Sequence, residues 1–534
     1  MGMLDREGRA SVLHATGVAD GLARPRPDRF GWALSDAAVP CWMLLLALVA
    51  RGPGFLLSSF GPDEGLYAVQ AREWLRGGWP YVAVWDMHPP GAPALFALAL
   101  ALLGESVAAV RLLGVLAVAA TGYLLFRCGR LAGAGRAVGL VAGLLYVAYS
   151  TVPEGASTNT ELLLAPFVTA GAGLAIHGAR EVLERRRAPG AGRMFGIGLC
   201  FGVALWIKSV AAPEAALAFA GLAGLALVRR AVGPGRLVPL ALAYALGCGL
   251  PMGATALAYA LRGEFDAFFQ ANFVAPLLYL GTEGPELPAT LRLLLAELLQ
   301  LAWLLGGMVV AVTEAALLAR RGDVRVALLP FAALLWFGAA TIGILLPGKF
   351  HGHYFLMWLP PLCLGAAFGL RAAVGLLAPR LPGIALLAAA AMVASMPVLA
   401  SLAGVARAGF ALLRPDPPRA IAAEIRRLLP PGETAFLVNY EPVVYLLAEL
   451  PLPTRMPFWQ HLGGDFGNVI GQGSDAELAR VLASRPYLLV VSEENWAKVR
   501  PEAREAIEAL LAAEYERAAT LLHGRNPVEI WRRR

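Results

Sequence analysis

Long apolar segments alternate with short polar loops over the first three quarters of the chain. Eleven of these segments are 18 or more residues long, and a helix that crosses a bilayer needs about 20 apolar residues. They cover residues 38–58, 107–127, 133–151, 158–178, 193–210, 211–228, 237–260, 293–319, 325–346, 353–374 and 382–405. This pattern predicts an α-helical polytopic membrane protein with about eleven transmembrane helices in residues 38–405.

One further apolar stretch, residues 89–103, is only 15 residues long and begins with Pro-Pro-Gly. Its length fits a surface or re-entrant segment as well as a span. If it does not cross the membrane, sixteen basic residues in five short loops share one face with the arginine-rich residues 1–37. Loops rich in Lys and Arg face the cytoplasm. We therefore expect residues 1–37 to be a cytoplasmic tail and residues 89–103 to stay at the opposite, outer surface.

This orientation brings three loops together on the outer face of the membrane. They are residues 59–106, 261–292 and 347–352, and the turn at 151–158 joins them. The last 129 residues hold 32 of the 83 charged residues, which predicts a soluble domain over 406–534. Because an odd number of spans precedes it, this domain is expected outside the cytoplasm.

Residues 406–534 alternate helix and strand patterns. Short apolar runs at 434–439 and 487–492 are typical of buried strands, and residues 499–513 have the spacing of an amphipathic helix. Residues 515–522 and 528–532 flank His-Gly-Arg-Asn-Pro and predict a closing hairpin. The sequence therefore predicts a small α/β domain at this end of the chain.

Composition excludes several classes of protein. The chain is 58% hydrophobic and 16% charged, whereas soluble domains carry about 25% charged residues, so a large soluble enzyme is excluded. The net charge of +7 comes mostly from short loops between apolar segments, and we expect no nucleic-acid partner. All five cysteines lie in or beside apolar segments, so no disulfide framework is indicated.

The first outer loop carries the most informative stretch of sequence. Asp63 and Glu64 follow Pro62 at the start of a helical pattern that Gly77 ends. The pattern predicts a helix lying along the membrane surface, with Arg72 on the side away from its apolar face. Asp63 could cap this helix and Glu64 could complement its dipole, without any further function. Both are also placed to act as acids or bases at the membrane boundary.

Basic and acidic residues gather in two of the outer loops. Asp86 and His88 lie in the first loop, and Lys349, His351 and His353 lie in Pro-Gly-Lys-Phe-His-Gly-His-Tyr. Four of the ten Lys and His residues of the chain therefore occupy two short outer loops. Carboxylates beside cations at this depth suit a base next to an anionic lipid phosphate. Two histidines at this spacing are weak evidence for a metal, and none is expected.

These motifs resemble a known family. Asp-Glu-Gly-x-Tyr at 63–67, Gly-x-Pro-Tyr at 78–81 and His-Pro-Pro-Gly at 88–91 are similar to the first outer loop of glycosyltransferase family 39. This family contains the dolichyl-phosphate-mannose protein mannosyltransferases and the bacterial aminoarabinose lipid A transferases. The Lys-Phe-His-Gly-His-Tyr segment at 349–354 is similar to one found in bacterial members.

The resemblance implies a GT-C fold, a polyprenyl-phosphate-sugar donor and catalysis on the outer face of the cytoplasmic (inner) membrane. It implies that Asp63 is the catalytic aspartate and Glu64 the acidic residue beside it. His88 stands where the aminoarabinose transferases have a lysine near the donor phosphate, and Glu161 lies near a further acidic residue of the family, although it could equally cap its helix. The mannosyltransferases carry a different domain from residues 406–534, so a protein acceptor is not implied.

The expected reaction needs a base for the acceptor and cations for the departing phosphate. Asp63 is expected to be the base, with inversion at the anomeric carbon and no cofactor beyond the donor itself. The residues expected to bind the donor phosphate or sugar are Tyr67, Asp86, His88, Glu161, Lys349, His351 and His353. A multi-pass transporter or flippase, or a membrane-anchored binding protein that works through residues 406–534, stays open as an alternative.

Overall fold

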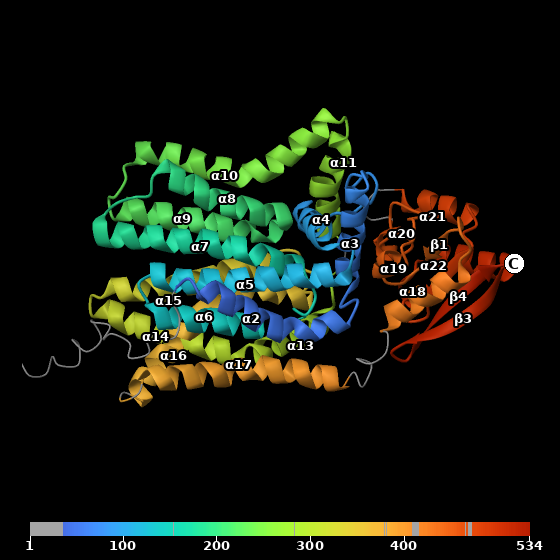
Figure 1. Cartoon of the computed structure of the whole chain (residues 1–534). Coiled ribbons are helices and arrows are strands. Elements are labelled where there is room, and N and C mark those ends of the chain that lie inside the picture. The colour runs from blue at the N-terminus through green and yellow to red at the C-terminus, as the bar shows by residue number, and fades with distance from the viewer. Residues whose placement is uncertain are drawn as a thin grey trace, which may run out of the picture.

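The computed structural model describes residues 36–152, 154–281, 284–378, 380, 382–407, 416–464, 466–467 and 473–534, apart from the side chains of 324–325 and 404–407. The expected cytoplasmic tail, 1–37, lies almost wholly outside these residues. The described chain forms a bundle of long helices and a smaller domain at one end of the bundle (Figure 1). The smaller domain contains the described residues from Asp416 onward.

Within the described residues, the bundle is made of eleven helices. They lie side by side (Figure 1). They are α2 (Val39–Arg51), continued by a 3-10 turn to Leu56, α5 (Val107–Leu131), α6 (Arg136–Tyr149), α7 (Thr160–Arg185), α8 (Ala191–Ile207), α9 (Ala212–Val228), α10 (Pro234–Leu261), α14 (Ala302–Arg320), α15 (Val324–Leu345), α16 (Leu359–Leu377) and α17 (Pro382–Arg407). Within the described residues, nine helical segments are long and apolar enough to cross a membrane, while α6 and α8 are shorter apolar helices. The prediction of a mostly helical, multi-pass membrane protein is confirmed.

Small residues allow the helices to approach closely, as in other membrane bundles. The contact between α8 and α10 shows this most clearly: a Cβ on Gly198 would collide with the backbone of Tyr244, and one on Gly247 with the backbone of Phe195. Helices this close exclude lipid and keep the ends of the bundle in fixed positions.

The predicted span at 293–319 is wrong at its start. Two helices, α13 (Leu287–Gln300) and α14, meet at Leu301, and only residues 302–320 form a candidate span. Helix α13 is rich in exposed leucines such as Leu291 and Leu295. The apolar sequence therefore continues through an interruption of the helix at Leu301 that hydropathy alone does not reveal.

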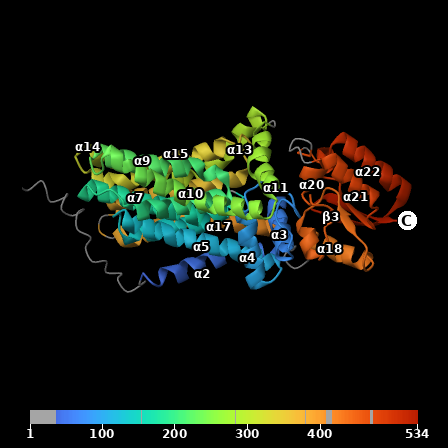
Figure 2. The ribbon, with the colours of Figure 1, turned by 90° about the horizontal axis from the view of Figure 1, so that it is seen from above.

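Two short helices fill the space at the end of the bundle. Helix α3 (Pro62–Leu75) lies between the bundle and the smaller domain in both views, and α4 (Gly91–Leu103) lies beside it (Figures 1 and 2). The remaining segments at this end are α11 (Phe265–Phe269), a π-helical turn (Gln270–Val274), α12 (Ala275–Leu280) and the 3-10 helix η4 (Gly352–Trp358).

Helix α3 is more deeply buried than a surface helix with an exposed polar side would be, and Arg72, which the sequence places away from the apolar face, is not exposed. Residues 64–72 are all buried. The Arg72 guanidinium donates to the carbonyl oxygens of Tyr445 at 2.7 Å and Leu450 at 2.9 Å, both in the smaller domain. The domain covers the side of α3 that the sequence pattern left polar, which explains the difference.

The smaller domain confirms the predicted α/β arrangement. Its strands are β1 (Ala435–Leu437), β2 (Leu488–Ser492), β3 (Tyr515–His523) and β4 (Asn526–Arg533), ordered β1-β2-β4-β3. Strands β1 and β2 are parallel, and the β3–β4 hairpin pairs antiparallel with β2. Its helices are α18 (Pro417–Leu428), α19 (Val443–Leu447), α20 (Trp459–Leu462), α21 (Ser474–Ala483), the 3-10 turn η6 (Trp496–Lys498) and α22 (Pro501–Glu514).

Candidate functional site

The start of helix α3 presents Asp63 at the junction of the two domains. Gly61 is the N-cap residue, Pro62 occupies the first turn, and no side-chain hydrogen bond caps the helix. Proline suits this position because its missing N–H is not needed there. Asp63 is therefore not the helix cap, and its half-buried carboxylate remains available for other chemistry.

Glu64, the next residue, is held by groups from two other segments. Its side chain is 4% exposed, and Oε1 accepts hydrogen bonds from the Arg111 guanidinium and from the backbone N–H of Thr158 at 2.7 Å. Arg111 also donates to the carbonyl oxygen of Gly54 at 3.1 Å. This arrangement fixes the start of α3 against α5 and against the turn before α7, so Glu64 positions its neighbour Asp63.

That turn, residues 150–158, is itself fastened to the bundle. The buried Arg51 guanidinium donates to the carbonyl oxygens of Ser150, Gly155, Ala156 and Ser157, at distances from 2.6 to 3.2 Å. One arginine therefore satisfies four carbonyl groups that the turn leaves without helical partners. These hydrogen bonds keep the polar residues of the turn in a fixed position.

Asp86 and His88 form a buried pair in the first outer loop. Asp86 is fully buried, and its Oδ1 accepts from His88 Nδ1 at 2.9 Å and from the Met87 N–H at 2.7 Å. Although burial opposes both charges, the pairing lowers the pKa of Asp86 and raises the pKa of His88. The His88 ring also lies edge-on to Tyr67, with centroids 5.8 Å apart.

Lys208 and Glu161 form a second buried pair, at the ends of α8 and α7. Lys208 Nζ lies 2.6 Å from Glu161 Oε1 and 4.2 Å from the ring centroid of Tyr354. The two residues are 6% and 1% exposed. Glu161 is thus ion-paired, and Asn159 is the N-cap residue of its helix. The sequence interpretation missed Lys208 as a site residue, although it is one of only three lysines in the chain.

The remaining predicted basic residues lie in the third outer loop and at the start of η4. Lys349 Nζ lies 4.7 Å from the ring centroid of Tyr279, and the rings of His351 and His353 stack at 5.5 Å. His353 Nδ1 is 3.4 Å from Oε2 of Glu154 in the turn. Within the described residues, no group of three or more His, Cys, Asp or Glu side chains is placed to hold a metal ion.

The charges of several of these groups act on the same buried tyrosines. The pKa of Tyr67 is raised by burial and by the charges of Asp63, Asp86 and Glu161. The pKa of Tyr279 is likewise raised, mainly by burial and in part by the charge of Asp63. Predicted residues of the first and third outer loops therefore lie near the start of α3, together with Tyr279 of the second loop, which was not predicted.

The smaller domain adds residues that the sequence pattern did not assign to the site. Ser59 donates to Oε2 of Glu441 at 3.2 Å, while burial and the nearby Asp63 and Glu64 raise the pKa of Glu441 to about 7. His461 of α20 lies edge-on to Trp85, with ring centroids 4.9 Å apart. Finding these contacts from sequence would require knowing how the two domains dock.

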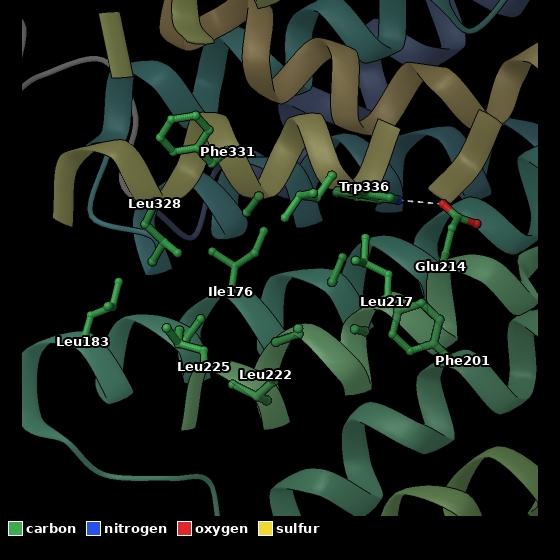
Figure 3. A pocket seen from close by; sticks show the side chains of 17 residues that line it. Ile176, Leu183, Phe201, Glu214, Leu217, Leu222, Leu225, Leu328, Phe331 and Trp336 are labelled. Carbon is green, nitrogen blue, oxygen red and sulfur yellow. Dashed lines mark hydrogen bonds between the residues drawn. The ribbon is translucent and has the colours of Figure 1, made fainter. Parts of the chain in front are cut away.

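An apolar cavity lies inside the bundle, apart from this polar cluster. It has a volume of about 330 Å³ and is lined by side chains of α7, α8, α9 and α15. Glu214, its one acidic residue, accepts a hydrogen bond from the indole N–H of Trp336 at 2.6 Å (Figure 3). The other labelled side chains in this view are hydrocarbon or aromatic.

Comparisons with known proteins bear on the fold of the chain. Residues 87–252 match the family model for dolichyl-phosphate-mannose-protein mannosyltransferase. No curated protein sequence matches the chain. The apo crystal structure of ArnT from Cupriavidus metallidurans is similar over 92% of this chain and 98% of that chain, with a TM-score of 0.57 and 19% identity. The same enzyme bound to undecaprenyl phosphate is similar over the same shares, with a TM-score of 0.55 and 18% identity.

The structural likeness extends over both the bundle and the smaller domain, and the family match begins in the first outer loop and runs into α10. The predicted GT-C fold is therefore confirmed, and so is the resemblance of this chain to glycosyltransferase family 39.

Proposed function

We propose that the protein is an inverting glycosyltransferase that moves a sugar from a polyprenyl-phosphate donor to an acceptor on the outer face of the cytoplasmic membrane. One observation carries this proposal. On a fold shared with ArnT, which has been crystallised with undecaprenyl phosphate, the half-buried carboxylate of Asp63 does not cap its helix and lies in the same cluster as the cations Lys208 and Lys349. A base beside cations at a membrane boundary is what such a transfer requires.

The reaction follows from the roles of these groups. The donor is already activated because its leaving group is a phosphate. Asp63 takes the proton of an acceptor hydroxyl or amine as that atom attacks the anomeric carbon from the face opposite the phosphate. The bond between the anomeric carbon and the phosphate oxygen breaks, and the polyprenyl phosphate leaves with both electrons. Attack opposite the leaving group inverts the configuration without a covalent enzyme intermediate.

The cations lower the energy of the departing phosphate. Lys349 and Lys208 lie beside aromatic rings at the end of the bundle next to the smaller domain. A prenyl phosphate would meet the membrane boundary there. His88, His351 and His353 add hydrogen-bond donors. The related ArnT structure bound to undecaprenyl phosphate supports a polyprenyl phosphate as the leaving group. A lipid, a glycan or a protein can each serve as the acceptor in this scheme.

The test uses purified protein in lipid nanodiscs and a panel of undecaprenyl-phosphate sugars. We expect the wild-type protein to release undecaprenyl phosphate from at least one donor. Release should be slow when water is the only acceptor and faster when an envelope-lipid extract supplies an acceptor. Asp63→Asn should lose this release. The proposal is contradicted if the wild-type protein releases no phosphate from any donor but moves labelled donor across proteoliposome membranes, which would indicate a flippase.

A further inference from the structure

His461 is buried without a hydrogen-bond partner for either ring nitrogen. The residue is 1% exposed, and neither Nδ1 nor Nε2 finds a partner within the described residues. A neutral imidazole offers one donor and one acceptor. Buried polar groups in folded proteins are nearly always paired, so an exception needs an explanation.

A second unpartnered polar atom belongs to Asp86, which follows Trp85, the residue whose ring contacts His461. Oδ1 of Asp86 is occupied by His88 and Met87, but Oδ2 is buried and has no partner among the described residues. Asp86, His88 and Asp63 all act electrostatically on the His461 ring. His461 and Asp86 therefore belong to one neighbourhood, which includes the candidate base.

A backbone hydrogen bond holds the segments that carry these two residues together. The N–H of Trp85 donates to the carbonyl oxygen of Arg455 at 2.7 Å, which ties the first outer loop to the smaller domain. The His461 ring is flanked by Trp85 and by Phe458, with ring centroids 4.9 and 4.7 Å away. The unpartnered nitrogens of His461 therefore lie between two aromatic rings, one of them from the first outer loop.

We propose that His461 and Asp86 form a hydroxyl-binding subsite for a sugar ring, so that the smaller domain takes part in choosing the sugar. Asp86 Oδ2 accepts a hydrogen bond from one hydroxyl, and the two imidazole nitrogens donate to and accept from others. A sugar hydroxyl can both donate and accept, which matches the unpartnered atoms. The sugar belongs either to the lipid-linked donor or to a glycan acceptor, and the inference rests on the transferase function proposed above.

The test variant is His461→Phe, which keeps a flat ring among Trp85 and Phe458 but removes both nitrogens. His461→Leu serves as a second variant if phenylalanine does not fold. His461→Gln keeps one donor and one acceptor. His523→Phe is the matched control, because His523 lies in the same domain and contacts Tyr440 at 3.0 Å.

KM measurements, made once with the donor varied and once with the acceptor varied, identify which substrate carries the sugar. We expect His461→Phe to raise KM about tenfold for one substrate, as loss of one or two neutral hydrogen bonds would, with kcat changed less than threefold. An increase for undecaprenyl-phosphate mannose or glucose assigns the subsite to the donor, and an increase only for the glycan acceptor assigns it to the acceptor. His461→Gln should recover part of the affinity, and His523→Phe should match the wild type.

Binding of undecaprenyl phosphate without a sugar separates this inference from the proposed function. Wild type and His461→Phe should bind it equally, because it has no sugar hydroxyls. If the wild type transfers sugar and His461→Phe shows unchanged KM for both substrates, the subsite is wrong and the transferase function stands. If the wild-type protein transfers no sugar from any donor, both proposals fail.

Discussion

At the end of the bundle next to the smaller domain, two charged residues, Lys208 and Glu161, are buried as a pair. Lys208 and Glu161 are removed from water, and each compensates the charge of the other. Buried pairs of this kind contribute little net stability but become costly when one partner is lost. Their presence at the end of two apolar helices is better explained by a requirement for a cation there than by stability.

Removing the charge of Lys208 should therefore lower the stability of the protein. Lys208→Met leaves the Glu161 carboxylate buried without its cation, and breaking a buried pair costs about 3–5 kcal/mol. We expect a clear fall in thermal stability in detergent, partly restored by adding Glu161→Gln. Lys498→Met, which removes an exposed lysine of the smaller domain, is the control. Equal melting temperatures for Lys208→Met and Lys498→Met would show that the Lys208–Glu161 pair is not important for the fold.

Lys349 should contribute to donor binding through its charge. A charge-assisted hydrogen bond contributes about 1.5–3 kcal/mol, so Lys349→Ala should weaken binding of undecaprenyl phosphate by roughly 10- to 150-fold. Lys349→Arg should keep much of the affinity, because it retains the positive charge. Normal lipid binding by the alanine variant, measured by microscale thermophoresis, would show that Lys349 does not bind the phosphate.

At the scale of elements, helix α3 connects the bundle to the smaller domain and carries the candidate base. Glu64 binds it to α5, Arg72 binds it to the segment after α19, and Gly65 allows close contact with α19 itself. A Cβ on Gly65 would lie 2.6 Å from the backbone nitrogen of Val443. The orientation of Asp63 therefore depends on a close contact between two domains.

Gly65→Ala should disturb this contact. The added methyl group meets backbone that cannot move without shifting α19, so we expect a lower melting temperature and slower transfer. Gly52→Ala is the matched control, because a Cβ there meets no atom within 4 Å and the backbone is already helical. The account of α3 is wrong if both variants melt and transfer like the wild type.

Sequence patterns predicted most elements correctly, since each depends on local periodicity. The strands β1 and β2, the helix α22 and the hairpin β3–β4 all lie where alternation and turn residues indicated. The break at Leu301 was not predictable, because both flanking helices are apolar. The burial of Arg72 was missed for a different reason: its partners are backbone carbonyls more than 370 residues away in the sequence.

The same limit applied to the site. The positive-inside rule places the first and third outer loops on the same face, so it could be predicted that their candidate residues lie near one another. These residues are Asp63, Tyr67, His88, Lys349, His351 and His353. Lys208 was overlooked because it follows an apolar helix, and only the fold shows that it meets Glu161. Glu441 and His461 reach the cluster through domain docking, which no local pattern encodes.

In the whole molecule, the proposed transfer on the outer face of the membrane requires that the smaller domain and the site both lie outside the cytoplasm. The two are in direct contact: the N–H of Ser58 donates to Asp416 Oδ2 at 2.7 Å. An alkaline phosphatase fusion after Arg534 should be active, and a green fluorescent protein fusion at the same position should be dark. The opposite pair of results would contradict both the orientation and the outward-facing site.

The most direct test of the central claim compares Asp63→Asn with the wild-type protein in three measurements: transfer rate, undecaprenyl phosphate affinity and melting temperature. Asn keeps the shape of the side chain but cannot take a proton, so transfer should slow by about 10²–10⁴-fold, the usual contribution of a positioned base. Lipid affinity should persist, because removing a negative charge does not weaken the attraction between phosphate and cations. The melting temperature should also change little, because Asp63 does not cap α3. Near-normal turnover of Asp63→Asn would contradict the account and move the base to Asp86 or Glu441.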